Sequence, residues 1–184
     1  MKKTIGLSLS CLLLIAISFG GCDWFDSVDD VSFGSTLEED ISVAEDNSGE
    51  NVAYEKTIVL DATADPDIDK YKSKIKGFKI NNISYQVTGY DGLATTFNGS
   101  LAFGDASSTS PQVLASITNL NLQTAFLNGT VFDLSLSQGD VDTIAGLLKD
   151  DKAVKLYLTG TLSQTPVYFT VHVILDVTVE ADAL

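Results

Sequence analysis

Residues 167–180 read VYFTVHVILDVTVE, and this stretch is the clearest signal of the class of fold. Every second residue from Val167 to Val179 is apolar, and the residues between them are mainly polar, with Ile174 as the exception. An alternation with period two is typical of a β-strand that buries one of its faces. The segment 154–159 alternates in the same way, so the end of the chain predicts two strands, each with one apolar face.

The same alternation predicts further strands upstream. It runs through residues 31–43 and 52–60, and the turn-forming sequence Asp46-Asn47-Ser48-Gly49 lies between these two segments. The apolar residues change parity at Asn81-Asn82, which predicts a bulge there, and Asp91-Gly92 predicts a hairpin turn. Shorter strands are predicted at residues 97–103, 113–122 and 131–136.

Two short helices are predicted between the strands. Asp65 before Pro66 has the chemistry of an N-cap followed by the first helical residue. Ser137 and Asp140 have the spacing of a capping box, with Asp in place of Glu. An apolar stripe at helical spacing follows each start: Ile68, Tyr71, Ile75 and Phe78 after the first, and Val141, Ile144, Ala145 and Leu148 after the second.

Eight or nine short strands without a βαβ rhythm predict an all-β fold. We therefore expect an antiparallel immunoglobulin-like β-sandwich with two short helical insertions, formed by a single domain at residues 31–184. The Cys–Trp–Cys signature of true immunoglobulin domains is absent, because Trp24 precedes the domain.

The amino terminus has the features of an export signal. Lys2 and Lys3 precede an apolar run from Ile5 to Phe19, which is short for a membrane-spanning helix. The sequence Phe19-Gly20-Gly21-Cys22 then resembles the lipobox of bacterial lipoproteins, in which cleavage precedes a lipid-modified cysteine. The resemblance implies a signal peptide at 1–21, lipidation of Cys22 and an acidic lipid-anchored tether at 22–30. An ordinary secretory signal is the alternative.

Charge and composition exclude several classes of function. The chain has 11 basic residues, all lysine, against 25 acidic ones, and its formal charge is −14. Removal of Lys2 and Lys3 would leave 9 lysines against 25 acids, a side-chain charge of −16. Nucleic-acid binding needs clustered cations, so we expect no nucleic-acid partner. After processing, Cys22 would be the only cysteine, which leaves no disulfide and no free thiol nucleophile.

Asp65, Asp67 and Asp69 have the spacing that opens an EF-hand calcium loop. That loop requires Gly at its sixth position and Glu at its twelfth, and these positions hold Lys70 and Lys76. The start of a helix explains the aspartates without a metal, because carboxylates there meet the positive end of the helix dipole. We expect no metal and no cofactor.

Five of the nine lysines beyond the signal peptide fall within ten residues. They predict a docking patch for an anionic glycan, a lipid headgroup or a protein, or else the solvated face of an amphipathic helix. A lysine patch would also be attracted to the acidic surface of its own protein. The patch consists of Lys70, Lys72, Lys74, Lys76 and Lys79.

Catalytic sets are not apparent in the sequence. His172 is the only histidine, and its parity places it opposite the valine face of its strand. No Gly-x-Ser-x-Gly elbow accompanies it. Paired carboxylates could perform glycoside hydrolysis, but the sequence ranks no pair among the 25 acids. Asp26-Ser27-Val28 and Asp142-Thr143-Ile144 resemble O-glycosylation sites of some gut-associated Gram-negative bacteria.

The segment from Lys152 to Ala183 resembles small uncharacterised outer-membrane lipoproteins of such bacteria. The shared features are a strand ending in Gly160-Thr161, a turn at Thr165-Pro166 and a long alternating strand. The resemblance implies a β-sandwich lipoprotein and no catalytic residue. We expect a lipid-anchored protein of the outer membrane, with the cell surface favoured over the periplasmic face, that binds a glycan or a protein. The alternatives are a periplasm-facing structural or assembly lipoprotein and a carboxylate hydrolase.

The anchor can be tested by one substitution. Cys22→Ala removes the only thiol that could carry the lipid, so we expect the protein to move from the membrane pellet to the soluble fraction after cell fractionation. Protein that stays in the membrane pellet after this substitution would contradict the lipid anchor.

Overall fold

The computed structural model describes residues 30–105 and 111–183 and confirms that the fold is mainly antiparallel β. Residues 1–29, which include Cys22, Trp24 and the site at Ser27, lie outside the described residues. In chain order the elements are β1 (Asp30–Asp61), a 3-10 turn (Ala62–Ala64), α1 (Pro66–Tyr71), β2 (Ile75–Gly92), β3 (Thr96–Gly104), β4 (Gln112–Asn121), α2 (Leu122–Leu127), β5 (Val131–Asp133), α3 (Gln138–Asp151) and β6 (Ala153–Asp182).

Strand β6 organises the sheet, because three other strands pair with it. Strand β1 pairs with β6 along almost its whole length, from Asp30 opposite Asp182 to Asp61 opposite Ala153. On the other edge, β2 pairs with the second part of β6 and β3 pairs with the first part. Strand β4 then extends the sheet beyond β3, and the short β5 extends it beyond β2.

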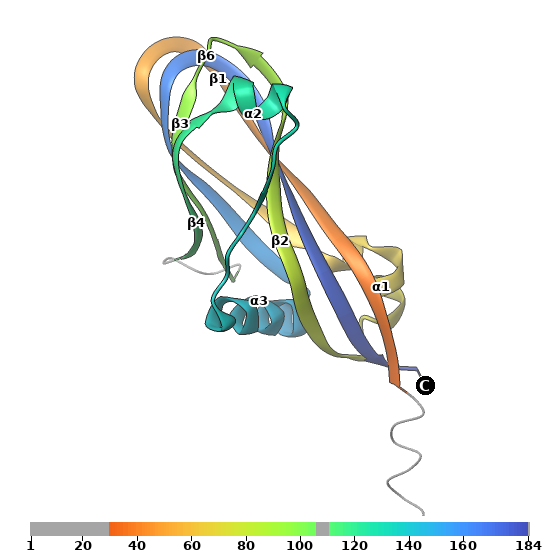
Figure 1. Ribbon diagram of the computed structural model, residues 1–184. Coiled ribbons are helices and arrows are strands. Elements are labelled where there is room, and N and C mark those ends of the chain that lie inside the picture. Colours follow the sequence, from red (N-terminus) through yellow and green to blue (C-terminus); the bar gives the residue numbers. More distant parts are fainter. Residues whose placement is uncertain (1–29, 106–110, 184) are drawn as a thin grey trace, which may run out of the picture.

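The long strands bend at one common level. Residues 46–48 of β1 interrupt its register, and the segments 93–95 and 163–166 lie at the same level. Two buried threonine hydroxyls join these bends. Thr165 donates to the carbonyl of Asn47 at 2.5 Å, and Thr95 bonds to the carbonyl of Gln164 at 2.9 Å. The bend divides β1 and β6 into two arms each, and it is visible at the top of Figure 1.

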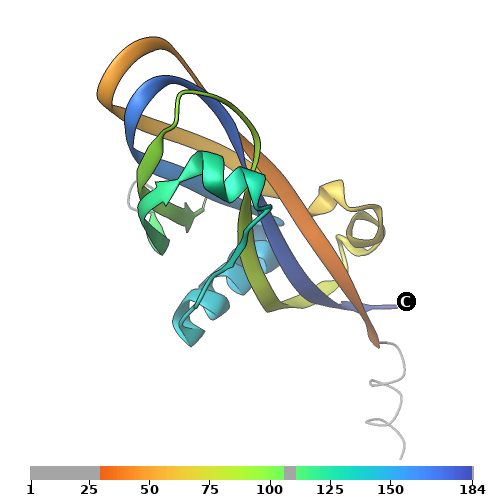
Figure 2. The same ribbon diagram turned by 45° about the horizontal axis from the view of Figure 1, so that its top comes forward.

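Because of the bend, the sheet curls and its two halves face one another (Figure 2). Side chains from both halves form one core: Val173 from the second arm of β6 and Leu156 from the first arm line the same small internal cavity. Ile144 of α3 also lines this cavity. Helices α2 and α3 lie in the opening between β3–β4 and β2 (Figure 1), and α1 lies on the side of β1.

The predicted helix starts are confirmed. Asp65 caps α1, with Pro66 as the first residue, and Ser137 and Asp140 form the capping box of α3. Helix α2 was not predicted, although Asn121 is its N-cap and accepts from the backbone NH of Thr124 at 2.8 Å. Within residues 30–105 and 111–183 there are thus three α-helices instead of two insertions.

Several details of the predicted strands are corrected. The predicted turn at Asp46–Gly49 is a bulge inside β1, so the predicted strands on either side of it are two arms of one strand. The two predicted C-terminal strands are likewise the two arms of β6, because β1 and β6 pair with each other on both sides of the bulge. Asp91-Gly92 forms no hairpin, since β2 and β3 both pair with β6 instead of with each other. The bulge at Asn81-Asn82 is confirmed. The immunoglobulin-like sandwich is not confirmed, because the described strands form one curled sheet.

A pair of glycines marks the tightest packing beside the bend. Gly99 of β3 lies opposite Gly160 of β6, and the ring of Phe97 covers both. A Cβ at Gly99 would lie 2.1 Å from the carbonyl oxygen of Thr159, and one at Gly160 would lie 2.4 Å from that of Asn98. Since the obstructing atoms belong to the backbone, this contact cannot relax by a side-chain rotation.

We expect Gly99→Ala to lower the free energy of unfolding by about 1–3 kcal/mol, because the added methyl forces the strands apart. Gly146 in α3 is the matched control, since a Cβ there meets no atom within 4 Å. Gly146→Ala should raise the free energy of unfolding by about 0.5–1 kcal/mol through the better helix propensity of alanine. Urea unfolding of both variants measures the difference, and equal effects would contradict the glycine pairing.

Candidate functional site

The bend gives the domain two distinct ends. We call the end formed by Asp30, Lys76 and Asp182 the base, and the end formed by the three bends the tip. Lys76 binds Asp30 at 2.5 Å and Asp182 at 2.6 Å, so it joins the first and last residues of the two longest strands. At about 3.3 Å per residue, the arm of β1 from Asp30 to Glu45 separates base and tip by roughly 50 Å.

All five lysines of the predicted patch are exposed, as the solvated-face interpretation and the docking interpretation both require. They lie on α1, on the turn after it and on the first part of β2. Lys72 pairs with Asp69 at 2.9 Å, and Lys70 lies over the ring of Tyr71 with 4.7 Å to its centroid. The expected attraction to the protein's own acids is therefore present at Lys72 and Lys76.

Asp65 is engaged by the chain itself. Its carboxylate accepts from the backbone NH groups of Asp67 at 2.7 Å and Ile68 at 3.2 Å, and from the hydroxyl of Ser35. Burial raises the pKa of Asp65, but these three hydrogen bonds outweigh it and hold the pKa below its ordinary value. Among the described residues, no group of three or more His, Cys, Asp or Glu side chains is arranged to hold a metal ion.

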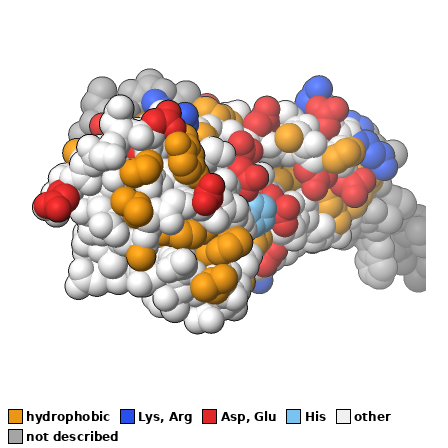
Figure 3. Space-filling model, turned by 90° about the horizontal axis from the view of Figure 1, so that it is seen from above, with side chains coloured by type: hydrophobic (Ala, Val, Ile, Leu, Met, Phe, Trp, Pro, Cys, Tyr) orange, Lys and Arg blue, Asp and Glu red, His pale blue; other side chains and the backbone are white. Residues whose placement is uncertain are grey.

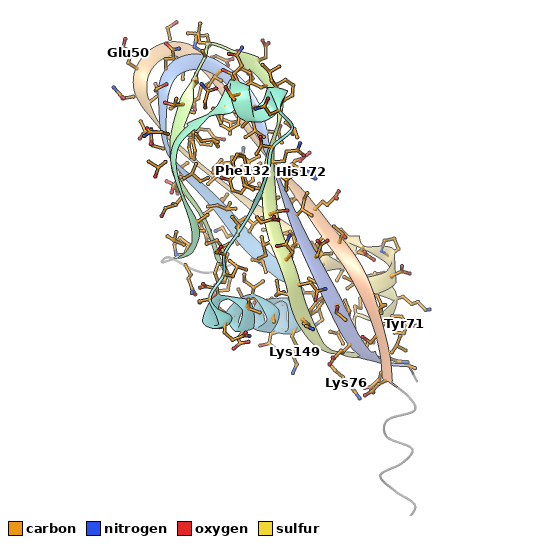
Figure 4. The ribbon with its side chains drawn as sticks, viewed as in Figure 1. Glu50, Tyr71, Lys76, Phe132, Lys149 and His172 are labelled. Atoms are coloured by element: carbon orange, nitrogen blue, oxygen red, sulfur yellow. The ribbon has the colours of Figure 1, made fainter. Side chains whose placement is uncertain are left out.

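His172 lies on the outer face of the sheet, opposite the apolar face, as its parity predicts. Its Nδ1 lies 2.7 Å from a carboxylate oxygen of Asp40, and its Nε2 lies 3.9 Å from one of Glu38. Figure 3 shows the imidazole on the surface with carboxylates around it, and Figure 4 labels His172 on the ribbon. Both ring nitrogens thus face carboxylates of the adjacent strand, and neither faces a hydroxyl nucleophile.

An acidic crevice of about 200 Å3 lies between the two arms of β1. The hydroxyl of Tyr54 bridges the arms by donating to the carbonyl of Ser42 at 3.2 Å. Burial, together with the Asp40 carboxylate, raises the pKa of Glu39 in the crevice wall. The crevice therefore holds carboxylates with pKa values displaced in opposite directions. Its acidic residues are Glu38, Glu39, Asp61 and Asp65.

Exposed apolar side chains gather at the tip. Leu127 is 72% exposed, Leu93 46% and Phe126 36%. Tyr90 contacts two of them: its ring lies 6.3 Å from that of Phe126, and its hydroxyl donates to the carbonyl of Leu93. We call Tyr90, Leu93, Phe126 and Leu127 the tip cluster. In the view from above, several hydrophobic side chains lie among uncharged atoms on the left half of the face, whereas those on the right half lie among charged side chains (Figure 3).

Beside the tip cluster, Tyr168 donates its hydroxyl to Asp46. This hydrogen bond, with burial and the nearby Asp91, raises the pKa of Tyr168, so the phenol stays protonated as a donor. The sequence did not predict the tip cluster, because its residues come from the end of β2, the segment after it and α2. Asn121, as the cap of α2, was the one local signal that pointed to it.

Comparisons with known proteins identify no family. No family model matches the chain, and no curated protein matches it. A chain in a solved structure titled "Structure of infectious bursal disease virus Gx strain" is similar over 80% of this chain and 36% of the viral chain, with 12% identity and a TM-score of 0.28. This chain thus spans about a third of the viral one, and a TM-score this low supports no statement about fold or function.

The part of the chain that the structure describes holds no helix with the length and apolar character needed to cross a membrane.

The cap at Asp65 predicts a specific dependence on pH. A lowered pKa stabilises the folded state above the ordinary value of 3.8, and this contribution is lost as pH falls through the folded pKa. Asp65→Ala should lower the free energy of unfolding by about 1 kcal/mol at neutral pH. Asp65→Asn keeps the cap, so it should cost less at neutral pH and should make stability less sensitive to acid.

Urea unfolding at neutral pH and below pH 3.8 measures both effects. Ser35→Ala is the matched control, because it removes one donor to the carboxylate and leaves the backbone cap in place. Equal acid sensitivity of Asp65→Asn and the unchanged protein would contradict the lowered pKa.

Proposed function

We propose that this chain is a lipid-anchored protein of the outer membrane whose domain presents a non-enzymatic binding surface, at the tip, for a glycan or another protein. One observation supports this most: the tip cluster exposes Leu93, Phe126 and Leu127 at the end opposite Asp30, where the tether from Cys22 would enter. A lipid at Cys22 would hold the base near the membrane, and the tip would be the part that meets ligands.

The chemistry of the tip suits a ligand with both apolar and hydroxyl surfaces. The rings of Tyr90 and Phe126 offer flat apolar contact, and aromatic side chains of this kind are enriched at binding surfaces. Asp46 and Asp91 add hydrogen-bond acceptors beside Tyr168. A sugar ring has an apolar face and hydroxyl donors, and an exposed protein loop can have the same combination.

The immunoglobulin-like sandwich remains a prediction within this proposal. In its support, the facing halves of the curled sheet share one core, as the inner faces of a sandwich do. A curled sheet of this kind can carry its ligand at the end where the strands bend.

Two alternatives remain as proposals. A periplasm-facing structural or assembly lipoprotein would use the same tip inside the envelope, and protease treatment of intact cells separates this orientation from surface display. A carboxylate hydrolase is favoured by the acidic crevice, where Glu39 and Asp65 differ in the direction of their pKa shifts. Against it, Asp65 already accepts three hydrogen bonds from the chain.

We expect Leu127→Ser to weaken ligand binding at least about tenfold, because central apolar contacts dominate binding surfaces. Its free energy of unfolding should stay within about 0.5 kcal/mol of the unchanged protein, since the side chain is largely exposed. Binding is measured with the purified protein on an array of bacterial and mucin-type glycans, and by cross-linking from position 127 to envelope proteins.

Val113→Ser is the control, because Val113 is 53% exposed on β4, away from the tip. It should leave binding unchanged. Equal binding by both variants would contradict the proposed surface, and so would the absence of both glycan binding and cross-links. Loss of product formation by Glu39→Gln in a glycosidase assay would instead support the hydrolase.

A further inference from the structure

The lysines of the described residues are distributed unevenly between the base and the tip of the domain. Eight of the nine lie toward the base, and the ninth, Lys56, lies opposite Leu158 in the middle of an arm. The tip carries no lysine in its described residues, but it carries four acids: Glu45, Asp46, Glu50 and Asp91. Figure 4 shows Lys76 and Lys149 at one end of the domain and Glu50 at the other. The lysines toward the base are Lys70, Lys72, Lys74, Lys76, Lys79, Lys149, Lys152 and Lys155.

Part of the positive charge at the base is already paired. Lys76 is bound between Asp30 and Asp182, and Lys72 is bound to Asp69. Lys74 and Lys79 are exposed, and neither has a carboxylate within 4.0 Å among the described residues. The ammonium groups of these two lysines are therefore available to an anionic surface outside the protein.

The length of chain before Asp30 places one such surface within reach. Seven residues separate Cys22 from Asp30, so even a fully extended tether spans at most about 28 Å. This is shorter than the distance of roughly 50 Å between base and tip. A lipid on Cys22 would thus keep the base, and not the tip, close to the membrane. Bilayers that contain anionic lipids attract cations within about one Debye length, near 8–10 Å.

We propose that the base docks on the anionic phospholipid headgroups of the membrane that holds the anchor, through Lys74 and Lys79, and that the tip points away from it. This inference rests on the proposed lipid anchor at Cys22. The anchor supplies the attachment, and the lysines select the orientation.

The orientation is measured with the full lipidated protein in vesicles. A fluorophore is attached at Ser73→Cys, between two base lysines, or at Ser48→Cys in the bend of β1; both serines are exposed. Quenching by a lipid with a nitroxide on its headgroup reports proximity to the bilayer. The vesicles contain phosphatidylcholine alone or phosphatidylcholine mixed with phosphatidylglycerol, and flotation of the vesicles is measured in parallel.

We expect the probe at position 73 to be quenched and the probe at position 48 to remain unquenched. Quenching at position 73 should increase with phosphatidylglycerol and decrease at high salt. Lys79→Gln should lower the ratio of docked to undocked orientations about fivefold, the effect of one lysine near an anionic surface. Lys56→Gln removes the same charge away from the base and should leave the ratio unchanged.

The outcomes separate the inference from the anchor on which it rests. Protein that floats with the vesicles but shows equal quenching at positions 73 and 48 overturns the docked orientation and leaves the anchor intact. Equal effects of Lys79→Gln and Lys56→Gln also overturn it. Protein that fails to float with vesicles of either composition overturns both the anchor and the orientation.

Discussion

The structure depends on one constraint: β6 is a strand of 30 residues with an apolar inner face on both sides of its middle. Fully extended, it would span about 100 Å, and one sheet of that length could not cover its own apolar face. The strand therefore bends at residues 163–166, and β1 bends with it at residues 46–48. Buried hydroxyls of Thr95 and Thr165 join the bends, so the two arms face each other across one core.

The bend also determines where functional groups lie. It folds β1 back so that its first and second arms border a common crevice, and it brings the end of β2 beside α2 to form the tip cluster. The first residue of β1 and the last residue of β6 meet at the base, where Lys76 binds both. The start of β1 and the end of β6 thus lie at one end of the domain and the tip cluster lies at the other, an arrangement that the proposed tethered binding module requires.

In the described part of the chain, stability comes from the packing of apolar side chains. The core consists of aliphatic and aromatic side chains from every strand except the short β5, with contributions from all three α-helices. Close backbone approach at Gly99 and Gly160, covered by the ring of Phe97, tightens the sheet just beyond the bend. Surface ion pairs such as Lys72–Asp69 add little, because both side chains are exposed to water.

Features that depend on near neighbours in the chain could be predicted from the sequence. Alternating apolar residues at 167–180 predicted the inner face of β6, Asp65-Pro66 and Ser137 predicted two helix starts, and the change of parity predicted the bulge at Asn81-Asn82. Each of these signals is local, because strand period, helix caps and bulges involve residues a few positions apart.

Which segments pair along the same edge of the sheet depends on the complete fold. Asp46–Gly49 and Asp91-Gly92 have the composition of turns that separate paired strands. The first, however, bends a single strand, and the second is followed by a strand, β3, that pairs with β6 as β2 does. The tip cluster was equally invisible, since Tyr90 joins its neighbour Leu93 to Phe126, which is far away in the sequence. Pairing is set by burial of the whole core, and no short stretch of sequence contains that information.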